Sequence, residues 1–158
     1  MKPVLYVIDD VLDAKEIKST HGFFENLIGN NYAWIDKDED VKFPLLKILS
    51  IVEGFFDLST LQGCECWAHV NTRTQMHIDI DDELWHRTGD IKYPICSIVY
   101  YPYIKNLQGG EFITKTFSVK PKQNRMIVFS PGISHGVEEF TGERTACAIN
   151  PWSYKKQR

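Results

Sequence analysis

The stretch MHIDID, residues 76–81, places His77 and Asp79 two positions apart, with Ile78 between them. In a β-strand, side chains at positions i and i+2 share one face. If this stretch is a strand, the imidazole and the carboxylate point the same way and Ile78 packs behind them. Because histidine nitrogen and carboxylate oxygen are both ligands of divalent transition metals, the pair predicts a strand that carries half of a metal site.

The best candidate for the other half is His135, in the stretch FSPGISHGVEEF, residues 129–140. There an apolar run ends in Pro-Gly and a short new strand begins, and a histidine at such a margin can face into a barrel. Three other histidines lack such a setting: His21, His69 and His86. Two histidines and one carboxylate on one face form the ligand set of non-haem iron sites, which leaves coordination positions open.

Arg144 stands at the predicted start of the last strand, in TGERTACAINPW, residues 141–152. The small residues Ala146 and Ala148 would share its face of the strand. An arginine that points into a β core is costly unless it meets a carboxylate, and no acid on this strand provides one. Because a planar guanidinium binds a carboxylate through two hydrogen bonds, the sequence predicts that Arg144 receives the carboxylate of a ligand.

The chain of 158 residues is long enough for one domain with a sizeable core and too short for two. Its hydrophobic content of 43% and charged content of 25% are typical of soluble globular proteins. The formal net charge of −3 gives no reason to expect nucleic acid as a partner. No apolar run has the length of a membrane span or a signal-peptide core. We therefore expect a cytoplasmic protein without a membrane partner.

The four cysteines fit the reducing environment of the cytoplasm: Cys64, Cys66, Cys96 and Cys147. Cys64 and Cys66 share one face of a predicted strand, but no second pair stands at the spacing of a zinc site. We expect all four to be buried free thiols.

The secondary structure that the sequence predicts changes near residue 62. Before it, residues 3–11 predict a strand, residues 11–29 a helix broken near Ser19–Thr20, residues 29–40 a polar turn, and residues 43–58 a second helix from apolar residues at helical spacing. After it come short runs rich in β-branched and aromatic residues, separated by Gly, Pro and Asn. These runs are residues 61–81, 93–104, 110–119, 125–132, 134–140 and 144–152.

Helices followed by many short strands predict an α+β domain with mostly antiparallel sheet. Six or more strands favour a sandwich, jelly roll or barrel, with the helices on one outer face. We expect a single domain over residues 1–158, in which residues 1–62 are mainly helical support and residues 63–152 form the β-barrel core.

From about residue 65 to residue 152, the chain resembles the double-stranded β-helix (jelly-roll, cupin-like) of 2-oxoglutarate/Fe(II)-dependent dioxygenases, on the prolyl 4-hydroxylase-like side of that superfamily. The family pattern is HxD, a strand with a tyrosine, a turn of two glycines followed by glutamate or threonine, and a strand before the second histidine, with an arginine or lysine about nine residues later. The matching stretches are HID at 77–79, SIVYYPY at 97–103, GGEF at 109–112, PKQNRMIVFSPGISHG at 121–136 and GERTACAINPW at 142–152.

This resemblance implies that His77, Asp79 and His135 hold Fe(II) and that Arg144 binds the C5 carboxylate of the co-substrate 2-oxoglutarate. In relatives a tyrosine on this strand often adds a hydrogen bond to that carboxylate, and Tyr101 matches it by position. Tyr101 and Tyr100 point to opposite faces of the strand, so only one of them can line the pocket. Pro102 follows, where relatives often carry leucine, and could end the strand early.

By the same resemblance, O₂ and 2-oxoglutarate would be consumed, an unactivated C–H bond hydroxylated, and succinate and CO₂ released. A peptide or protein residue, in the manner of prolyl hydroxylases, is the expected substrate. A free amino acid or another small molecule is the alternative substrate. Two other classes stay open, a cupin-like metal enzyme that does not need Arg144, and a binding module without turnover.

Residues 79–94, DIDDELWHRTGDIKYP, predict a polar loop that leaves the barrel from the metal-bearing strand. Connections of this length are often functional, and in the family this segment often folds over the substrate. Trp85 would either anchor the loop by packing down or close over the substrate. Arg87 would serve an acidic or carbonyl group of the substrate.

Overall fold

The computed structural model describes residues 2–27, 32–39 and 43–157. These residues form three helices: α1 (Ala14–Leu27), α2 (Leu45–Val52) and α3 (Asp82–Thr88). They also form nine strands: β1 (Leu5–Ile8), β2 (Ala33–Asp36), β3 (Gly63–Val70), β4 (Ser97–Gly109), β5 (Phe112–Thr114), β6 (Ser118–Val119), β7 (Met126–Phe129), β8 (His135–Val137) and β9 (Phe140–Trp152).

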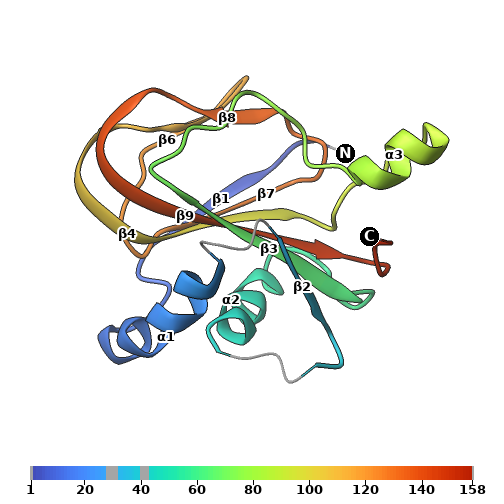
Figure 1. Cartoon of the computed structure of the whole chain (residues 1–158), viewed down its shortest axis with the longest axis horizontal. Helices are drawn as coiled ribbons and strands as arrows, with labels where there is room; N and C mark the ends of the chain where they lie inside the picture. The colour runs from blue at the N-terminus through green and yellow to red at the C-terminus, as the bar shows by residue number, and fades with distance from the viewer. Residues whose placement is uncertain (1, 28–31, 40–42, 158) are drawn as a thin grey trace.

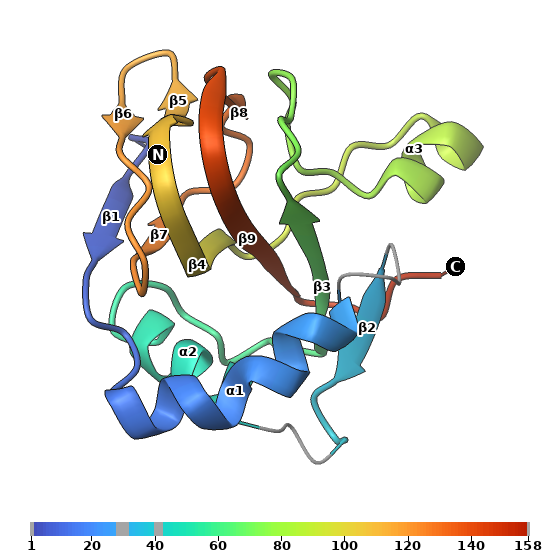
Figure 2. The ribbon, with the colours of Figure 1, turned by 60° about the vertical axis from the view of Figure 1, so that its left-hand side comes forward.

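The strands form two antiparallel sheets. The larger has the order β1-β7-β4-β9-β3-β2 and the smaller the order β6-β5-β8. Helices α1 and α2 lie on one side of the large sheet, and the small sheet lies on the other side (Figures 1 and 2). The prediction of an α+β chain with helices on one outer face is therefore confirmed.

Strand β4 shows how alternation along a strand builds two cores. Ile98 and Tyr100 belong to a cluster with the helices, whereas Val99 and Tyr101 belong to a cluster between the two sheets. Successive side chains of a strand point to opposite faces, so one strand serves both clusters. The predicted opposite orientation of Tyr100 and Tyr101 is confirmed. Strand β4 continues past Pro102 with an irregularity between Tyr100 and Tyr103 instead of ending early.

Both predicted N-terminal helices form. Asp13 and Glu16 make a reciprocal cap at the start of α1, where each side chain accepts a hydrogen bond from the backbone N–H of the other residue. The predicted break at Ser19–Thr20 is wrong, because α1 runs through both residues. Helix α2 buries one face against the sheet, formed by Leu45, Ile48, Leu49 and Val52.

Residues 1–62 contribute more than helices. Strand β1 pairs with β7 at one edge of the large sheet. Strand β2 pairs with β3 at the other edge and lies inside the segment predicted to be a polar turn. Residues 29–31 and 40 of that predicted turn lie outside the described residues.

Two further predictions about the extended and loop segments are wrong. Residues 76–81 form an isolated bridge at His77 instead of a strand, and Ile78 is 41% exposed instead of packed behind its neighbours. Residues 79–94 contain α3, which begins after Asp81, whose carboxylate accepts a hydrogen bond from the backbone N–H of Leu84. An aspartate at this position is a common N-cap.

The four cysteines are free and buried, as predicted. Burial raises the pKa of the Cys64 and Cys96 thiols to about 12, so both stay protonated near neutral pH. Among the helices that the structure describes, none is long and apolar enough to cross a membrane.

The buried residue Asn124 joins the N-terminal segment to the barrel. Its side-chain oxygen accepts hydrogen bonds from the backbone N–H of Leu12 and from the hydroxyl of Tyr100, and its amide nitrogen donates to the Leu12 carbonyl. Its φ of 65° lies in the left-handed region, which asparagine tolerates better than most residues.

We expect Asn124→Ala to lower the free energy of unfolding by about 3 kcal/mol or more, because each buried group left without a partner costs about 1–3 kcal/mol. Urea denaturation measures this loss. Asn106→Ala is the matched control, since Asn106 has a φ of 50° but is exposed. Equal losses in the two variants would mean that backbone strain, and not the hydrogen bonds of Asn124, is responsible.

Candidate metal centre

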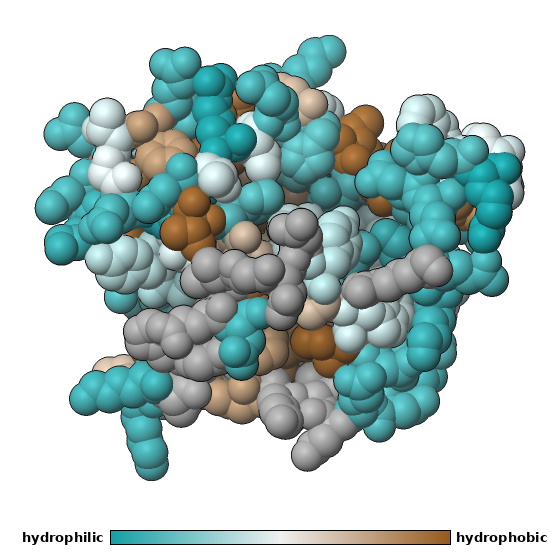
Figure 3. Space-filling view, in the orientation of Figure 1, coloured by the Kyte–Doolittle hydropathy of each residue, from teal (hydrophilic) through white to brown (hydrophobic). Residues whose placement is uncertain are grey.

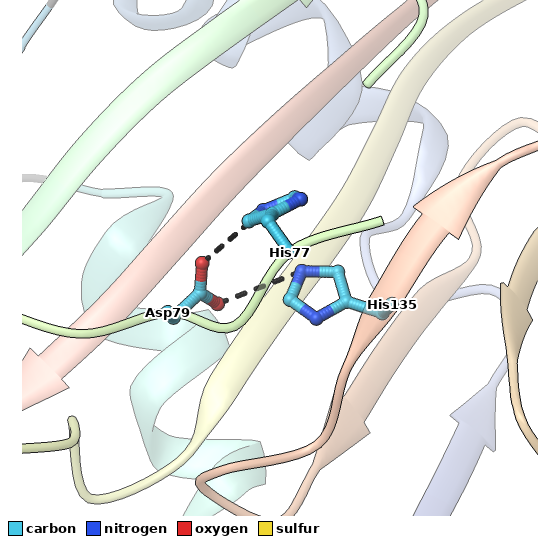
Figure 4. A group of neighbouring side chains, drawn as sticks. All are labelled: His77, Asp79 and His135. Carbon is cyan, nitrogen blue, oxygen red and sulfur yellow. Dashed lines mark ion pairs between the residues drawn. The ribbon is translucent and has the colours of Figure 1, made fainter. Parts of the chain in front are cut away.

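The structure brings together the side chains of His77, Asp79 and His135 (Figure 4). Their ligand atoms all lie within 4.8 Å of one another. The Nε2 atoms of His77 and His135 lie 3.5 Å and 3.7 Å from the two carboxylate oxygens of Asp79. Among the described residues, no other group of three metal-ligating side chains is this compact.

Backbone hydrogen bonds hold the two histidines side by side. The N–H of His77 donates to the carbonyl of His135 at 2.9 Å, and the N–H of His135 donates to the carbonyl of His77 at 2.9 Å. This reciprocal pair fixes the register between the extended segment and β8, and it places the two ring centroids 4.3 Å apart. The relative position of the imidazoles is thus a property of the backbone.

Both imidazoles are oriented by a carbonyl two residues earlier. The Nδ1 atom of His77 lies 2.8 Å from the carbonyl oxygen of Gln75, and that of His135 lies 2.9 Å from the carbonyl oxygen of Ile133. A carbonyl can only accept, so each Nδ1 carries the proton. When each ring is neutral, the lone pair of Nε2 therefore faces the centre of the group, which is the orientation that a metal ligand needs.

Ser97, at the start of β4, forms a hydrogen bond that orients the side chain of Asp79. The Ser97 hydroxyl donates to the Asp79 carboxylate at 2.7 Å. Burial raises the pKa of this carboxyl, but the contact with His77, the charge of His135 and the Ser97 hydroxyl outweigh burial, so the pKa of Asp79 lies below its ordinary value. The carboxylate is therefore ionised and available as an anionic ligand.

The two histidines differ in electrostatic setting. Burial lowers the pKa of His135, whose ring stacks on Phe112 at a centroid distance of 5.5 Å and meets the Phe129 ring at 4.8 Å. The carboxylate of Asp79 raises the pKa of the more exposed His77. A bound metal takes the place of any proton on Nε2, so metal binding at this group competes with protonation.

Arg144 lies within β9, four residues after the strand begins at Phe140, instead of at its start as predicted. It is only 2% exposed. Its backbone N–H donates to the side-chain oxygen of Asn71 at 2.8 Å, and the Asn71 N–H donates back to its carbonyl at 3.0 Å. Its Nη1 donates to the carbonyl of Gly110 at 3.2 Å, in a turn where Gly109 and Gly110 both have positive φ.

The guanidinium of Arg144 has no carboxylate partner within 4.0 Å among the described residues, and its Nε makes no hydrogen bond. Its central carbon lies 5.5 Å from the ring centroid of Tyr101 and 5.2 Å from that of Phe140. Burial lowers the pKa of Arg144, although arginine stays charged in proteins. A buried cation with an unused donor is a site for an anion.

Tyr101 presents a second unused donor beside Arg144. Its side chain is fully buried, and its hydroxyl makes no hydrogen bond with the described residues. Burial raises the pKa of Tyr101 to about 12, so the hydroxyl keeps its proton and can donate it.

Two connected spaces surround these residues. A cavity of about 40 Å³ is lined by Tyr101, Arg144 and the triad, and an open cleft of about 350 Å³ adjoins it. The cavity and the cleft share Trp67, His69, Thr74, His77 and Asp79. His77 and Asp79 therefore lie between a smaller space that Arg144 also lines and a wider, more open one.

The structure does not bring Trp85 and Arg87 to this site. Trp85 is 44% exposed on α3 and lines neither the cavity nor the cleft. Arg87 donates to the side chain of Gln157 at 2.6 Å and faces a different surface hollow. Of the residues in α3, it is Asp82 that lines the cleft.

Sequence reasoning missed two residues that support the site. Ser97 shares a strand face with Tyr101, so the alternation along residues 97–101 already placed it toward the triad. Asn71 gave no such signal, because its partner Arg144 lies on a strand distant in the sequence.

No protein-family model matches the chain, and no curated protein matches it in sequence. Solved structures do match. The collagen prolyl hydroxylase of Paramecium bursaria Chlorella virus-1, solved as a 2OG complex, is 16% identical, with a TM-score of 0.64 over 93% of this chain and 94% of that chain. A Pseudomonas putida prolyl-4-hydroxylase is 17% identical, with a TM-score of 0.63 over 96% and 88% of the two chains.

A third match is a prolyl hydroxylase from Trichoplax adhaerens, solved with a peptide fragment of the hypoxia inducible factor oxygen degradation domain. It is 14% identical, with a TM-score of 0.59 over 94% of this chain and 83% of that chain. Likeness at these identities shows the fold. The predicted double-stranded β-helix is therefore confirmed.

We expect Ser97→Ala to weaken Fe(II) binding by roughly 10- to 100-fold, because groups that orient a metal ligand typically contribute this much to affinity. Asp79→Ala should abolish binding. Anaerobic Fe(II) titration measures both effects, with Ser118→Ala as the control, since Ser118 is exposed on the small sheet.

His86→Ala should bind Fe(II) like the unmodified chain, because His86 lies on α3 and its Nδ1 is 2.6 Å from the Asp82 carbonyl. A loss of iron in this variant, or its retention in Asp79→Ala, would show that the triad is not the metal site.

Proposed function

We propose that this chain is an Fe(II)- and 2-oxoglutarate-dependent dioxygenase that hydroxylates an unactivated C–H bond, in the manner of prolyl hydroxylases acting on a residue of a peptide or protein. One observation carries the proposal. The buried guanidinium of Arg144 and the buried hydroxyl of Tyr101 both have unused donors, in the cavity that the His77–Asp79–His135 triad also lines.

The donor set fits 2-oxoglutarate, which has a carboxylate at each end. Arg144 and Tyr101 would bind the C5 carboxylate, since a guanidinium and a hydroxyl are the donors that carboxylates prefer. The cavity of about 40 Å³ has room for only a few water molecules.

The triad fits Fe(II). His77, Asp79 and His135 would hold the ion through two neutral imidazoles and one carboxylate, a ligand set that would leave room for the keto-acid end of 2-oxoglutarate. The iron, when bound with 2-oxoglutarate, supplies the activation of O₂ and the oxidation of the substrate, with release of succinate and CO₂.

The residues of the chain position these groups and exclude water. The carbonyls of Gln75 and Ile133 aim the two imidazoles, and Ser97 aims Asp79. Apolar side chains line most of the rest of the cavity, among them Val99, Phe112 and Ala146. Hydrogen bonds to Arg144 and Tyr101 gain strength in such a space, because the local dielectric constant is low.

The open cleft beside the triad supports a peptide-sized substrate, since it is broad and leads directly to His77 and Asp79. The Trichoplax neighbour, which shares the fold, was solved with a peptide. The cytoplasmic location, the lack of a nucleic-acid partner and the division of the chain near residue 62 stay predictions.

Succinate formation tests the proposal. We expect the chain with Fe(II) and O₂ to convert 2-oxoglutarate to succinate slowly alone, and faster with a substrate drawn from proline-containing peptides, free amino acids and cell extracts. A gain of 16 Da, one oxygen atom, identifies the product. Binding of 2-oxoglutarate without succinate in any arm would indicate a binding module, and succinate with amino acids alone would indicate a small-molecule hydroxylase.

Arg144→Met should raise the 2-oxoglutarate concentration needed for half-maximal succinate formation by roughly 30-fold or more. The basis is a loss on the order of 2–5 kcal/mol for truncating one partner of a buried charge pair, at about 1.4 kcal/mol per decade. Fe(II) binding should persist. Lys105→Met is the control, because the Lys105 side chain is 61% exposed. An unchanged 2-oxoglutarate requirement in Arg144→Met would refute this assignment.

A further inference from the structure

Asn150 is a buried side chain with an unused acceptor at the wall of the open cleft. It is 2% exposed, its Oδ1 makes no hydrogen bond with the described residues, and it lines the cleft. A buried amide oxygen without a partner costs on the order of 1–3 kcal/mol. The position is therefore prepared for a donor that arrives from outside the chain.

The alternation along β9 explains why Asn150 faces the cleft. Arg144, Ala146 and Ala148 line the small cavity, and Asn150 is the next residue on the same face. One face of β9 thus runs from the proposed co-substrate site to the cleft. A group that contacts Asn150 would lie on the triad's open side.

The adjoining part of this wall comes from β3, the neighbouring strand of the same sheet, in which Glu65 pairs with Asn150 and Trp67 pairs with Ala148. The Trp67 ring stacks on Tyr32 at a centroid distance of 5.1 Å and an interplanar angle of 22°. Its indole N–H donates to Nε2 of His69 at 2.9 Å. This part of the wall is aromatic.

The cleft is acidic. Its lining includes Glu65, Asp79 and Asp82 and contains no lysine or arginine. Glu65 is already compensated, because Lys156 lies 2.8 Å from one carboxylate oxygen and the Trp152 indole donates to the other at 3.1 Å.

The carboxylates of Asp82 and its neighbour Glu83 carry the uncompensated charge. Both residues are exposed in the first turn of α3, and neither forms an ion pair with any described residue. Figure 3 shows the hydrophilic surface over α3. Asp82 lines the cleft, and Glu83 lies beside it on an adjoining hollow that Lys156 also lines. Because Lys156 is paired with Glu65, Asp82 and Glu83 leave this end of the cleft negative when a divalent cation is bound at Asp79.

The cleft therefore offers three features: the Asn150 oxygen as an acceptor, the negative charge of Asp82 and Glu83, and the aromatic ring of Trp67. Together they favour a cation that donates hydrogen bonds. Lysine and arginine side chains have only donors, and both are attracted to aromatic faces. The Asn150 oxygen can accept a hydrogen bond from such a group, and the Asp82 carboxylate on the same cleft offsets its charge.

We propose that the cleft between Asn150 and α3 recognises a lysine or arginine side chain of the substrate, with Asn150 Oδ1 as the buried acceptor and Asp82 and Glu83 as the attracting rim. This inference rests on the proposed function, because it takes the bound peptide to be the substrate of that enzyme. It makes Asn150 a residue that determines specificity.

The test measures binding without turnover, on the full chain loaded with Zn(II) in place of Fe(II) and saturated with 2-oxoglutarate. The probes are four capped nonapeptides of glycine and serine that differ only in the central residue, which is arginine, lysine, citrulline or glutamate. Citrulline matches arginine in shape and lacks its charge. Calorimetry gives the dissociation constants.

We expect the arginine and lysine peptides to bind at least about 10-fold more tightly than the citrulline and glutamate peptides, since hydrogen bonds to charged groups exceed those to neutral ones by about this factor. Asn150→Leu should remove roughly 10-fold of the arginine affinity. The double variant Asp82→Asn/Glu83→Gln, which changes only exposed side chains, should weaken binding of basic peptides and reduce its dependence on salt.

Glu138→Gln is the control for charge, because Glu138 is exposed and lies on neither the cavity nor the cleft. Equal binding of the arginine and citrulline peptides overturns the proposal, even if Asn150→Leu weakens both, because the acceptor would then serve a peptide N–H. Unchanged binding in the double variant also overturns it.

Calorimetry of 2-oxoglutarate on the Zn(II)-loaded chain separates this result from the proposed function. Failure of 2-oxoglutarate to bind, while basic peptides still bind, would reject the oxygenase and leave the cleft assignment standing. Normal 2-oxoglutarate binding without any preference for basic peptides would reject the cleft assignment and leave the proposed oxygenase standing.

Discussion

The charge of Arg144, enclosed between two β-sheets with no carboxylate of the described chain to neutralise it, constrains the architecture around it. The cost of burying such a group is several kcal/mol, and the surrounding structure reduces it with backbone groups and aromatic rings. The Gly109–Gly110 turn supplies a carbonyl, Asn71 fixes the backbone of β9, and Tyr101 and Phe140 flank the guanidinium. The cavity and the cleft both lie along the face of β9 that carries Arg144 and Asn150.

The parts of this structure that could be predicted from sequence follow from local periodicity. The alternation of residues 97–101 separated Tyr100 from Tyr101, and apolar spacing identified α2. The triad residues could be grouped because histidine and aspartate in an HxD pair, followed by a distant histidine and arginine, suit one chemistry. The fold class followed from helices preceding many short strands.

The remaining features depend on contacts between residues far apart in the chain. Ile78 is exposed because the segment of His77 pairs with β8 at one bridge only, which no local pattern reveals. Strand β2 forms in a polar stretch because β3 offers it an edge. Asn150 reads locally as a polar residue before a proline, and its buried, unpaired oxygen is apparent only once β3 and α3 are in place.

The orientation of both triad imidazoles by main-chain carbonyls has an evolutionary consequence. A substitution at position 75 or 133 changes a side chain but leaves the carbonyl that accepts the Nδ1 proton. The neighbours of the ligands are therefore free to drift as long as the backbone keeps its path. Sequence similarity between proteins with such a site can therefore fall to a very low level while the geometry of the metal ligands is kept.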